Sequence, residues 1–246
     1  MTKQELEQIL ESLPSRKIAV IGDGCVDIYW EADMRLSELS REVPHYPLPV
    51  VAERFSLGAG ANVAANLAAM GVSDIRFVGC VGEDWRGTVF RGLLGGIGVS
   101  DRYLVLSSER ITPAYCKPIR KGISDIQYED PRLDFNSRSP LSQELEKQLL
   151  SKLEEAAEDA DVLIVCDQLQ NGCITPAVME RVSRMGRSMT VVADSRDRVG
   201  EFRNAIIKPN EIEACRCLGM DASAASDIDI MKQAALILSQ RTGCPA

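Results

Sequence analysis

Two glycines and two asparagines make residues 57–71 a candidate ligand site. Gly58 and Gly60 allow the backbone to approach a ligand closely because they carry no Cβ atom. The alanine-rich residues after this glycine loop predict a helix, whose free N–H groups and positive dipole end point back at the loop. Asn62 and Asn66 are four residues apart and share one face of that helix. The stretch predicts the floor of a polar ligand site, although a glycine turn before a tightly packed helix explains the spacing equally well.

Acidic and amide residues follow several short apolar runs. Asp23 and Asp27 come just after the run at 17–21, and later runs end at Asp167, Asp194 and Asn210. In open α/β sheets ligands bind outside the carboxyl ends of the strands. Ionised carboxylates are good acceptors for sugar hydroxyls. Five polar groups at one edge of a sheet therefore predict a cleft of polyol size, and turn or cap chemistry is the alternative explanation.

Short apolar runs alternate with helical patterns along most of the chain. Such runs are typical of buried parallel strands, and the alternation predicts a parallel sheet with helices on both faces. The runs occupy residues 17–21, 75–82, 103–106, 162–166, 189–193 and 205–208. Ser139 and Pro140 are typical of a helix start. The sequence therefore predicts an α/β fold and one domain over residues 1–246.

Two segments differ in composition from the rest of the chain and predict a small separate sheet. Residues 28–52 contain three prolines and the single histidine, and 48–51 is typical of an edge strand, where proline is tolerated. Two extended runs flank Lys121 and Gly122 and predict a hairpin. We expect these segments, at about 28–53 and 111–135, to pair as a lid.

The composition excludes several classes of protein. The 246 residues carry 28 basic and 36 acidic side chains, a net charge of −8 with histidine neutral, which argues against nucleic-acid binding. No apolar run approaches the ~20 residues that a membrane span needs, and no signal peptide is evident. The eight cysteines include no C-x-x-C pair. We therefore expect a cytoplasmic protein with reduced thiols and no structural zinc site.

Four stretches carry a resemblance to a known family. Gly58-Ala59-Gly60-Ala61-Asn62, followed by Ala65-Asn66 and Gly71, resembles the first signature of the ribokinase-like (pfkB) sugar kinases. Residues 21–27 resemble the first sugar-binding turn of that family, and residues 208–213 resemble its N-x-x-E motif. Residues 48–51 and 132–135 resemble lid elements of the heptose-phosphate kinase branch. The resemblance extends from about Lys17 to the last residue.

The resemblance implies a three-layer α/β/α fold with a small β lid, and ATP-dependent phosphorylation of a sugar or sugar phosphate. The residues implied to bind the sugar hydroxyls are Asp23, Asp27, Gly58, Gly60 and Asn62. Asn210 and Glu213 would organise Mg²⁺ and the nucleotide phosphates through water. Asp194 and Lys208 would lie beside them on the phosphates, although a lysine at a strand end is often simply solvated. The lid would also pair two subunits as a homodimer.

One expected motif is missing from the sequence. The family's second signature, G-x-G-D, supplies the aspartate base and an anion hole, and no such stretch occurs in residues 1–246. We therefore expect the chain to be C-terminally truncated relative to such kinases, with a sugar site but little kinase activity, and we assign it no catalytic residue. The alternatives are a non-catalytic sugar or sugar-phosphate binding protein and an unrelated doubly wound nucleotide-binding protein.

Overall fold

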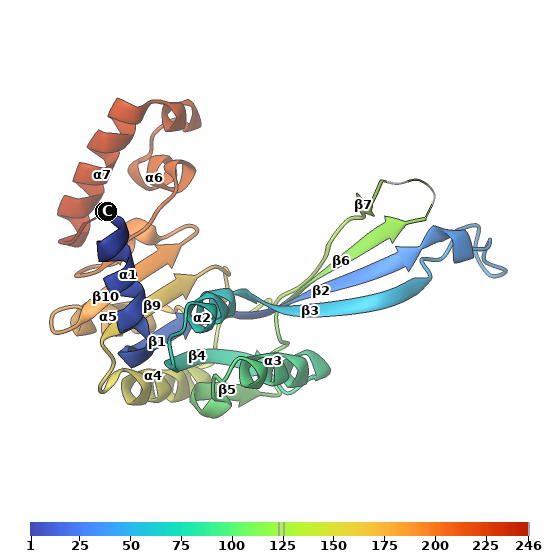
Figure 1. Cartoon of the computed structure of the whole chain (residues 1–246), viewed down its shortest axis with the longest axis horizontal. Coiled ribbons are helices and arrows are strands. Elements are labelled where there is room, and N and C mark those ends of the chain that lie inside the picture. Colours follow the sequence, from blue (N-terminus) through green and yellow to red (C-terminus); the bar gives the residue numbers. More distant parts are fainter. Residues whose placement is uncertain (123, 125, 246) are drawn as a thin grey trace.

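The larger of two sheets contains six parallel strands. The computed structural model describes every residue except 123, 125 and 246. The strands are β1 (Lys17–Gly22), β4 (Asp74–Gly82), β5 (Leu104–Ser107), β9 (Val162–Asp167), β10 (Thr190–Ser195) and β11 (Ile206–Ile207). Their order is β11-β10-β9-β1-β4-β5, which places β1 inside the sheet (Figure 1). The parallel sheet predicted from the apolar runs is confirmed.

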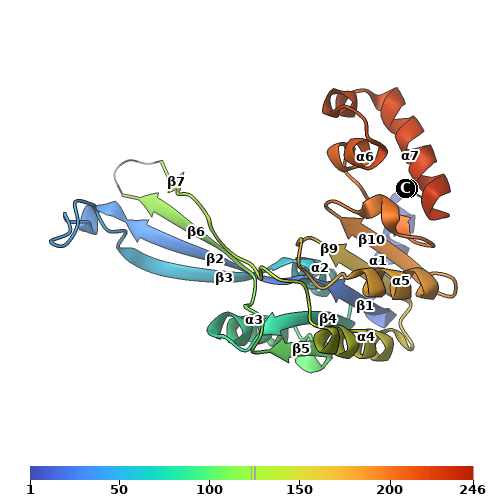
Figure 2. The same cartoon turned by 180° about the vertical axis from the view of Figure 1, so that it is seen from behind.

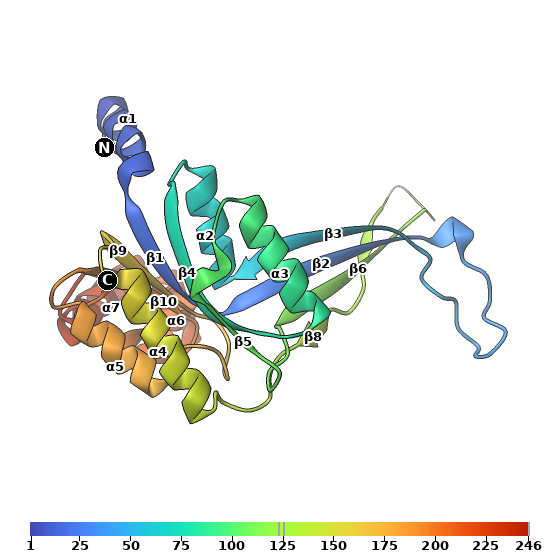
Figure 3. The same ribbon diagram turned by 90° about the horizontal axis from the view of Figure 1, so that it is seen from below.

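Helices cover both faces of this sheet. Helices α2 (Gly60–Ala69) and α3 (Trp85–Gly96) lie on one side, and α4 (Gln143–Ala157) and α5 (Pro176–Met185) lie on the other (Figure 3). Each side has its own apolar core, with Phe77 and Phe90 in one and Leu149 and Leu153 in the other. The predicted three-layer α/β/α architecture is therefore confirmed.

The remaining helices lie near the two ends of the chain. Helix α1 (Lys3–Ser12) precedes β1, and α6 (Glu211–Leu218) and α7 (Ile228–Thr242) follow β11 (Figure 2). Helix α4 begins at Gln143, later than Ser139 and Pro140 suggested, because Ser142 caps it by accepting the N–H of Leu145. No helix in the described part of the chain combines the length and apolar character needed to cross a bilayer.

The second sheet extends away from the main body of the molecule (Figure 1). It consists of β2 (Gly24–Asp33), β3 (Val50–Ala59), β6 (Ala114–Lys121), β7 (Tyr128–Glu129) and β8 (Leu133–Phe135). Strand β2 pairs antiparallel with β3 and parallel with β6, and β6 and β7 form the predicted hairpin. These strands overlap the two segments in which we expect a lid, but β2 begins earlier, at Gly24, and β3 continues to Ala59. Closure over a ligand remains a prediction.

The glycine stretch differs from its predicted form. Residues 57–59 are the end of β3 and not a loop, because Gly58 pairs with Cys25 and Ala59 with Gly24 on β2. Helix α2 begins directly afterwards at Gly60. A glycine-rich segment has low intrinsic strand preference, so its extended form here comes from pairing with a distant segment.

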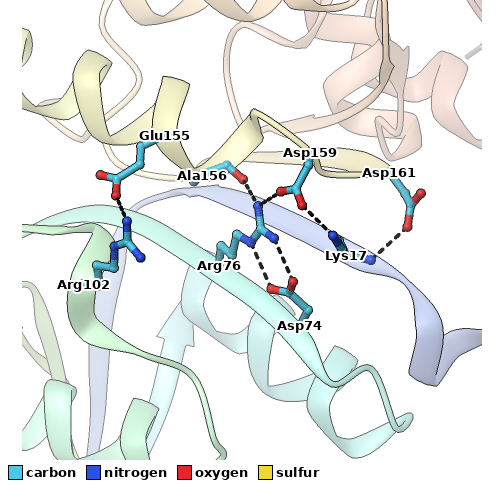
Figure 4. Close-up of polar contacts among 8 residues, drawn as sticks. All are labelled: Lys17, Asp74, Arg76, Arg102, Glu155, Ala156, Asp159 and Asp161. Atoms are coloured by element: carbon cyan, nitrogen blue, oxygen red, sulfur yellow. Dashed lines mark hydrogen bonds and ion pairs between the residues drawn. The ribbon is translucent and has the colours of Figure 1, made fainter.

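The amino ends of β1 and β4 carry a cluster of ion pairs (Figure 4). The Arg76 guanidinium donates to both oxygens of Asp74 at 2.9 and 2.7 Å, to the Ala156 carbonyl at 3.1 Å and to Asp159. Lys17 also pairs with Asp159. A cation at the carboxyl end of α4 satisfies a free carbonyl there and complements the helix dipole. The cluster therefore ties the end of α4 to the start of the sheet.

Candidate functional site

One face of the second sheet is polar and the other is apolar. On the ladder, Asp27 lies between Ser56 of β3 and Tyr115 of β6, and Tyr29 lies between Arg54 and Lys117. The alternate residues Val26, Ile28 and Cys116 are buried in the core shared with α2 and α3. Since successive side chains of a strand point to opposite faces, the polar set lies on the face away from this core.

Asp27 lies close to a cation and over a glycine. Its Oδ1 is 3.4 Å from the Lys117 Nζ, and its side chain is 22% exposed. A Cβ atom on Gly58 would lie 3.2 Å from the Asp27 Cγ, so Gly58 makes room for this carboxylate. Burial opposes the charge of Lys117, but its hydrogen bond to Tyr29 and the charge of Asp27 raise its pKa. Asp27 therefore keeps acceptor capacity for a ligand hydroxyl.

Two arginine guanidinium groups lie over tyrosine rings of the same face. The Arg54 guanidinium is 3.8 Å from the centre of the Tyr29 ring, and that of Arg132 is 4.1 Å from the Tyr115 ring. Arg132 also donates to both oxygens of Asp134, at 2.6 and 2.7 Å. Stacking and pairing hold these long side chains in place. The face can therefore hydrogen-bond hydroxyl groups and attract an anionic group.

Asp23 has a different environment from Asp27. It is 1% exposed, and its two oxygens accept the backbone N–H groups of Gln168 at 2.9 Å, Leu169 at 2.7 Å and Cys173 at 2.7 Å. Burial raises its pKa to about 6, although these three donors act in the opposite direction. A Cβ atom on Gly172 would lie 2.0 Å from Asp23 Oδ1. Asp23 thus anchors the loop between β9 and α5, and we leave it out of the residues proposed to touch a sugar.

The start of α2 is tightly packed against the main sheet. The Gly60 N–H donates to the Asp23 carbonyl at 2.9 Å, and a Cβ atom there would lie 2.9 Å from the Cys166 Cβ. Gly60 therefore serves close packing within the chain, as the simpler interpretation of the sequence expected. Asn62 and Asn66 lie exposed on α2, and neither side chain has a hydrogen-bond partner in the described residues. The Asn62 amide therefore keeps its hydrogen-bonding capacity for a ligand.

The N-x-x-E motif forms a helix cap. Asn210 Oδ1 accepts the Glu213 N–H at 2.8 Å, and Glu213 Oε2 accepts the Asn210 N–H at 2.9 Å, which is a capping box at the start of α6. The Asn210 amide group and the second Glu213 oxygen remain for other partners. The described residues contain no cluster of three or more histidine, cysteine or acidic side chains suited to a metal. A Mg²⁺ ion here would therefore depend mainly on phosphate and water ligands.

Two further candidates lie at the end of β10 and after β11. The Lys208 Nζ is 3.6 Å from Asp194 Oδ1, and the Gln168 amide nitrogen is 3.4 Å from Asp194 Oδ2. Asp167, at the end of β9, is buried and bound by Arg198 and Ser195. The strand ends thus divide into Asp23 and Asp167, which the protein itself binds fully, and Asp194, which remains half-buried beside an exposed lysine.

Comparison with known proteins identifies the family. The profile described as "pfkB family carbohydrate kinase" matches residues 16–241. The chain belongs to the pfkB family of carbohydrate kinases. It is 31% identical over 219 residues to the bifunctional protein HldE of Citrifermentans bemidjiense, covering 87% of this chain and 43% of that one. It is 27% identical to HldE of Pelobacter propionicus, covering 99% and 48%. The chain thus spans less than half the length of these curated relatives.

Solved structures of two kinases share the fold. The tetrameric inhibited form of phosphofructokinase-2 from Escherichia coli superposes with a TM-score of 0.67 at 17% identity, covering 93% of this chain and 71% of that one. Arabidopsis thaliana ribokinase complexed with ribose and ATP gives 0.60 at 20% identity, covering 92% and 69%. At these identities the likeness supports the fold. The resemblance to the heptose-phosphate kinase branch is confirmed by the HldE relatives.

The sequence interpretation missed several residues of the polar face of the second sheet. Tyr29, Arg54, Tyr115 and Lys117 face Asp27 or its neighbours, yet none of them belongs to the motifs that carried the resemblance. The available signal was their spacing of two along the lid strands, which places them on the same face as Asp27. Only the register between β2, β3 and β6 shows that these residues lie together, and the sequence does not give that register.

Proposed function

We propose that this chain provides the sugar-binding part of an ATP-dependent kinase that phosphorylates a hydroxyl group of a sugar or sugar phosphate. The observation that carries the proposal is the partly exposed Asp27 carboxylate, held over Gly58 on the polar face of the second sheet in a pfkB-family chain. Asp27 and Asn62 would accept and donate hydrogen bonds to sugar hydroxyls. The cations Arg54, Lys117 and Arg132 would favour a substrate that also carries an anionic group.

The second sheet would act as a lid over this sugar. Closure excludes water from the reacting groups and prevents simple hydrolysis of the nucleotide. The lid also exposes apolar side chains, including Val50 and Val51 on the edge strand β3. We infer that two chains pair through these strands, and a molecular mass of one chain by light scattering at micromolar concentration would refute this pairing.

Nucleotide and magnesium fit the region around α6. Asn210, Glu213 and Asp194 offer oxygen and amide groups, and Lys208 offers a flexible cation; these are the donor types that a magnesium nucleotide uses. Mg²⁺ supplies charge neutralisation on the phosphate oxygens when bound. In this proposal Lys208 binds phosphate and the second oxygen of Glu213 orients a water molecule.

The two candidate functions differ in whether the protein phosphorylates the sugar that it binds. The 246 residues contain no G-x-G-D stretch, the motif that the resemblance links to the base and the anion hole. The second candidate is a sugar or sugar-phosphate binding protein without kinase activity. A kinase part predicts that the chain binds ATP with Mg²⁺ as well as the sugar. A simple binding protein predicts stabilisation by the sugar and none by ATP.

The test is calorimetric titration of the parent protein and of Asp27→Asn with a heptose 7-phosphate and with fructose 6-phosphate. Loss of a charge-assisted hydrogen bond costs ~1.5–3 kcal/mol, so we expect Asp27→Asn to weaken sugar binding by ~10- to 100-fold. Its urea midpoint should stay close to that of the parent. Asp229→Asn, an exposed change on α7, is the matched control and should leave the affinity unchanged. Equal affinities for Asp27→Asn and the parent would refute the sugar site.

A further inference from the structure

Helix α1 has an apolar stripe that the described part of the chain leaves exposed. None of its ten residues is buried, and Leu6, Ile9 and Leu10 are 40%, 50% and 46% exposed. With the partly buried Leu13 they follow the i, i+3, i+4, i+7 spacing that places side chains on one face of a helix. The helix points away from α4 and α5 (Figure 3). Its stripe is therefore open to a partner.

Helix α1 is too short to be stable by itself in water. Isolated helices of fewer than ~12–15 residues are marginal, and most helical stability in proteins comes from packing of an apolar face. The capping box of Thr2 and Glu5 supports α1 but supplies no such packing. A membrane surface fits poorly, because α1 carries one lysine and three glutamates, whereas helices that lie on membranes are rich in basic residues. We therefore expect a protein surface as the partner.

An open groove of about 410 Å³ lies between the carboxyl ends of α4 and α5. Ala157, Met185 and Met189 form its apolar floor, and the two methionines pack against the core on this side of the main sheet. Methionine side chains adapt readily to the shape of a partner. Met189 directly precedes β10, so the groove lies at the amino ends of the strands, away from the residues proposed to bind sugar and nucleotide.

The two walls of the groove carry opposite charges. Glu158, just after α4, lies on one side, and Arg184 of α5 lies on the other; both are exposed. Glu158 makes no ion pair within the described residues. Arg184 pairs with Glu180 at 2.7 Å, and both of these side chains are more than half exposed. Such an exposed pair contributes little, so Arg184 can exchange its partner.

The charges beside the apolar stripe of α1 match these walls. By helical periodicity, Lys3 lies on one side of the stripe and Glu5 on the other. Lys3 is exposed and is 3.6 Å from Glu7, which is again a weak surface pair. A helix that lays its stripe on the methionine floor can therefore place Lys3 against Glu158 and Glu5 against Arg184. Helices bind apolar grooves in this way through side chains at the spacing seen in α1.

We propose that α1 of one copy of this chain docks into the groove of a second copy, and that the second copy returns the contact. Reciprocal exchange is two-fold symmetric and closed. Helix and groove lie at the same edge of the sheet, since the N–H of Lys17, at the start of β1, donates to Asp161, shortly after α4, at 2.9 Å (Figure 4). The exchange doubles the buried area toward the ~1,200–2,000 Å² of a stable interface.

The experiment is sedimentation equilibrium of the whole chain. Every sample carries Val51→Asp, an exposed change on β3 that weakens pairing through the lid, so the remaining association reports the α1 contact. We expect reversible pairing of two chains at micromolar concentration. Ile9→Asp on the apolar stripe should weaken it by at least tenfold. Gln8→Asp places the same charge on the opposite face of α1 and is the matched control, with an affinity within twofold of the parent.

An exchange of charges tests whether the groove is the docking place. Lys3→Glu and Glu158→Lys should each weaken the pair, and the double variant should restore it. Lys3→Glu favours the isolated helix, because a negative charge suits its amino end, so its effect does not come from loss of α1. Since no residue of α1 is buried, its variants should keep the urea midpoint of the parent.

Weakening by Ile9→Asp alone among the two stripe tests, together with restoration in the double variant, supports the proposal. Three results would overturn it. The first is a mass of one chain at every concentration, and the second is an equal effect of Ile9→Asp and Gln8→Asp. The third is an unchanged affinity in Glu158→Lys or no restoration in the double variant, which would mean that α1 pairs with another surface, such as a second α1.

Discussion

Two groups of acidic side chains differ in their binding partners. One group lies at the carboxyl ends of β1 and β9, and the other lies on the polar face of the second sheet. Asp23 and Asp167 are buried, and backbone N–H groups or Arg198 and Ser195 occupy their oxygens. Asp27 is partly exposed, and the Lys117 Nζ lies 3.4 Å from its carboxylate. The first kind of acid holds segments together, whereas the second kind can exchange its partner for a ligand.

This difference shows that the position of an acidic residue at a strand end is a weak guide to ligand binding. Five polar groups at one edge predict a cleft of polyol size, yet hydrogen bonds within the chain account for Asp23, Asp167 and the Asn210 cap. Acids can occur at strand ends because the loops that begin there need acceptors for their backbone N–H groups. The stronger guide is an acid with unused acceptor capacity.

The largest effect is expected for Asp167→Ala. Arg198 donates to both oxygens of Asp167 and to the Ile174 carbonyl, so removal of the carboxylate leaves a half-buried guanidinium without a counter-ion. Breaking such a pair costs ~3 kcal/mol, measured as a lower free energy of unfolding in urea. Asp229→Ala on the exposed face of α7 is the control and should cost less than ~0.5 kcal/mol. A cost below ~1 kcal/mol for Asp167→Ala would mean that this acid is as exchangeable as Asp27.

A smaller, pH-dependent effect is expected at Asp23. Its folded-state pKa is raised from 3.8 to about 6, so the folded state favours the protonated form. Protonation of Asp23 therefore stabilises the folded state. This stabilisation is fully present below pH 4 and is lost as the pH rises through 6. The difference in unfolding free energy between the parent and Asp23→Asn should therefore be larger at pH 4 than at pH 7. If the three N–H donors instead outweigh burial, the difference will grow with pH, and urea unfolding at both values distinguishes the two signs.

Much of the fold could be predicted because its signals are local. The run at 162–166 is apolar throughout, and β9 occupies Val162–Asp167. The strand at 57–59 was missed because glycine and alanine carry no strand signal and the pairing partner, β2, lies more than thirty residues earlier. The lid hairpin was recognised from Lys121 and Gly122, which supplied a turn between extended runs.

The candidate site was harder to predict for the same reason. The partners of Asp23 are backbone groups of residues 168–173, and no spacing in the sequence connects them. The Asn210–Glu213 capping box, in contrast, is a local pattern that the sequence shows directly. A spacing of three residues fits both a helix cap and a metal-binding motif. The spacing alone therefore does not show that Asn210 and Glu213 bind a metal.

The smallest effect concerns Ala59, which joins the two regions. Its φ of 49° and ψ of −132° lie in a region that alanine rarely adopts, so the link between β3 and α2 stores strain. Ala59→Gly should relieve it and raise the free energy of unfolding by ~1 kcal/mol, after the larger entropy of glycine in the unfolded chain is subtracted. Ala65→Gly in the interior of α2 is the matched control and should lower stability by ~1 kcal/mol. Opposite signs in urea unfolding would show that the junction is strained in the free protein, whereas a loss of stability in both variants would show that it is not.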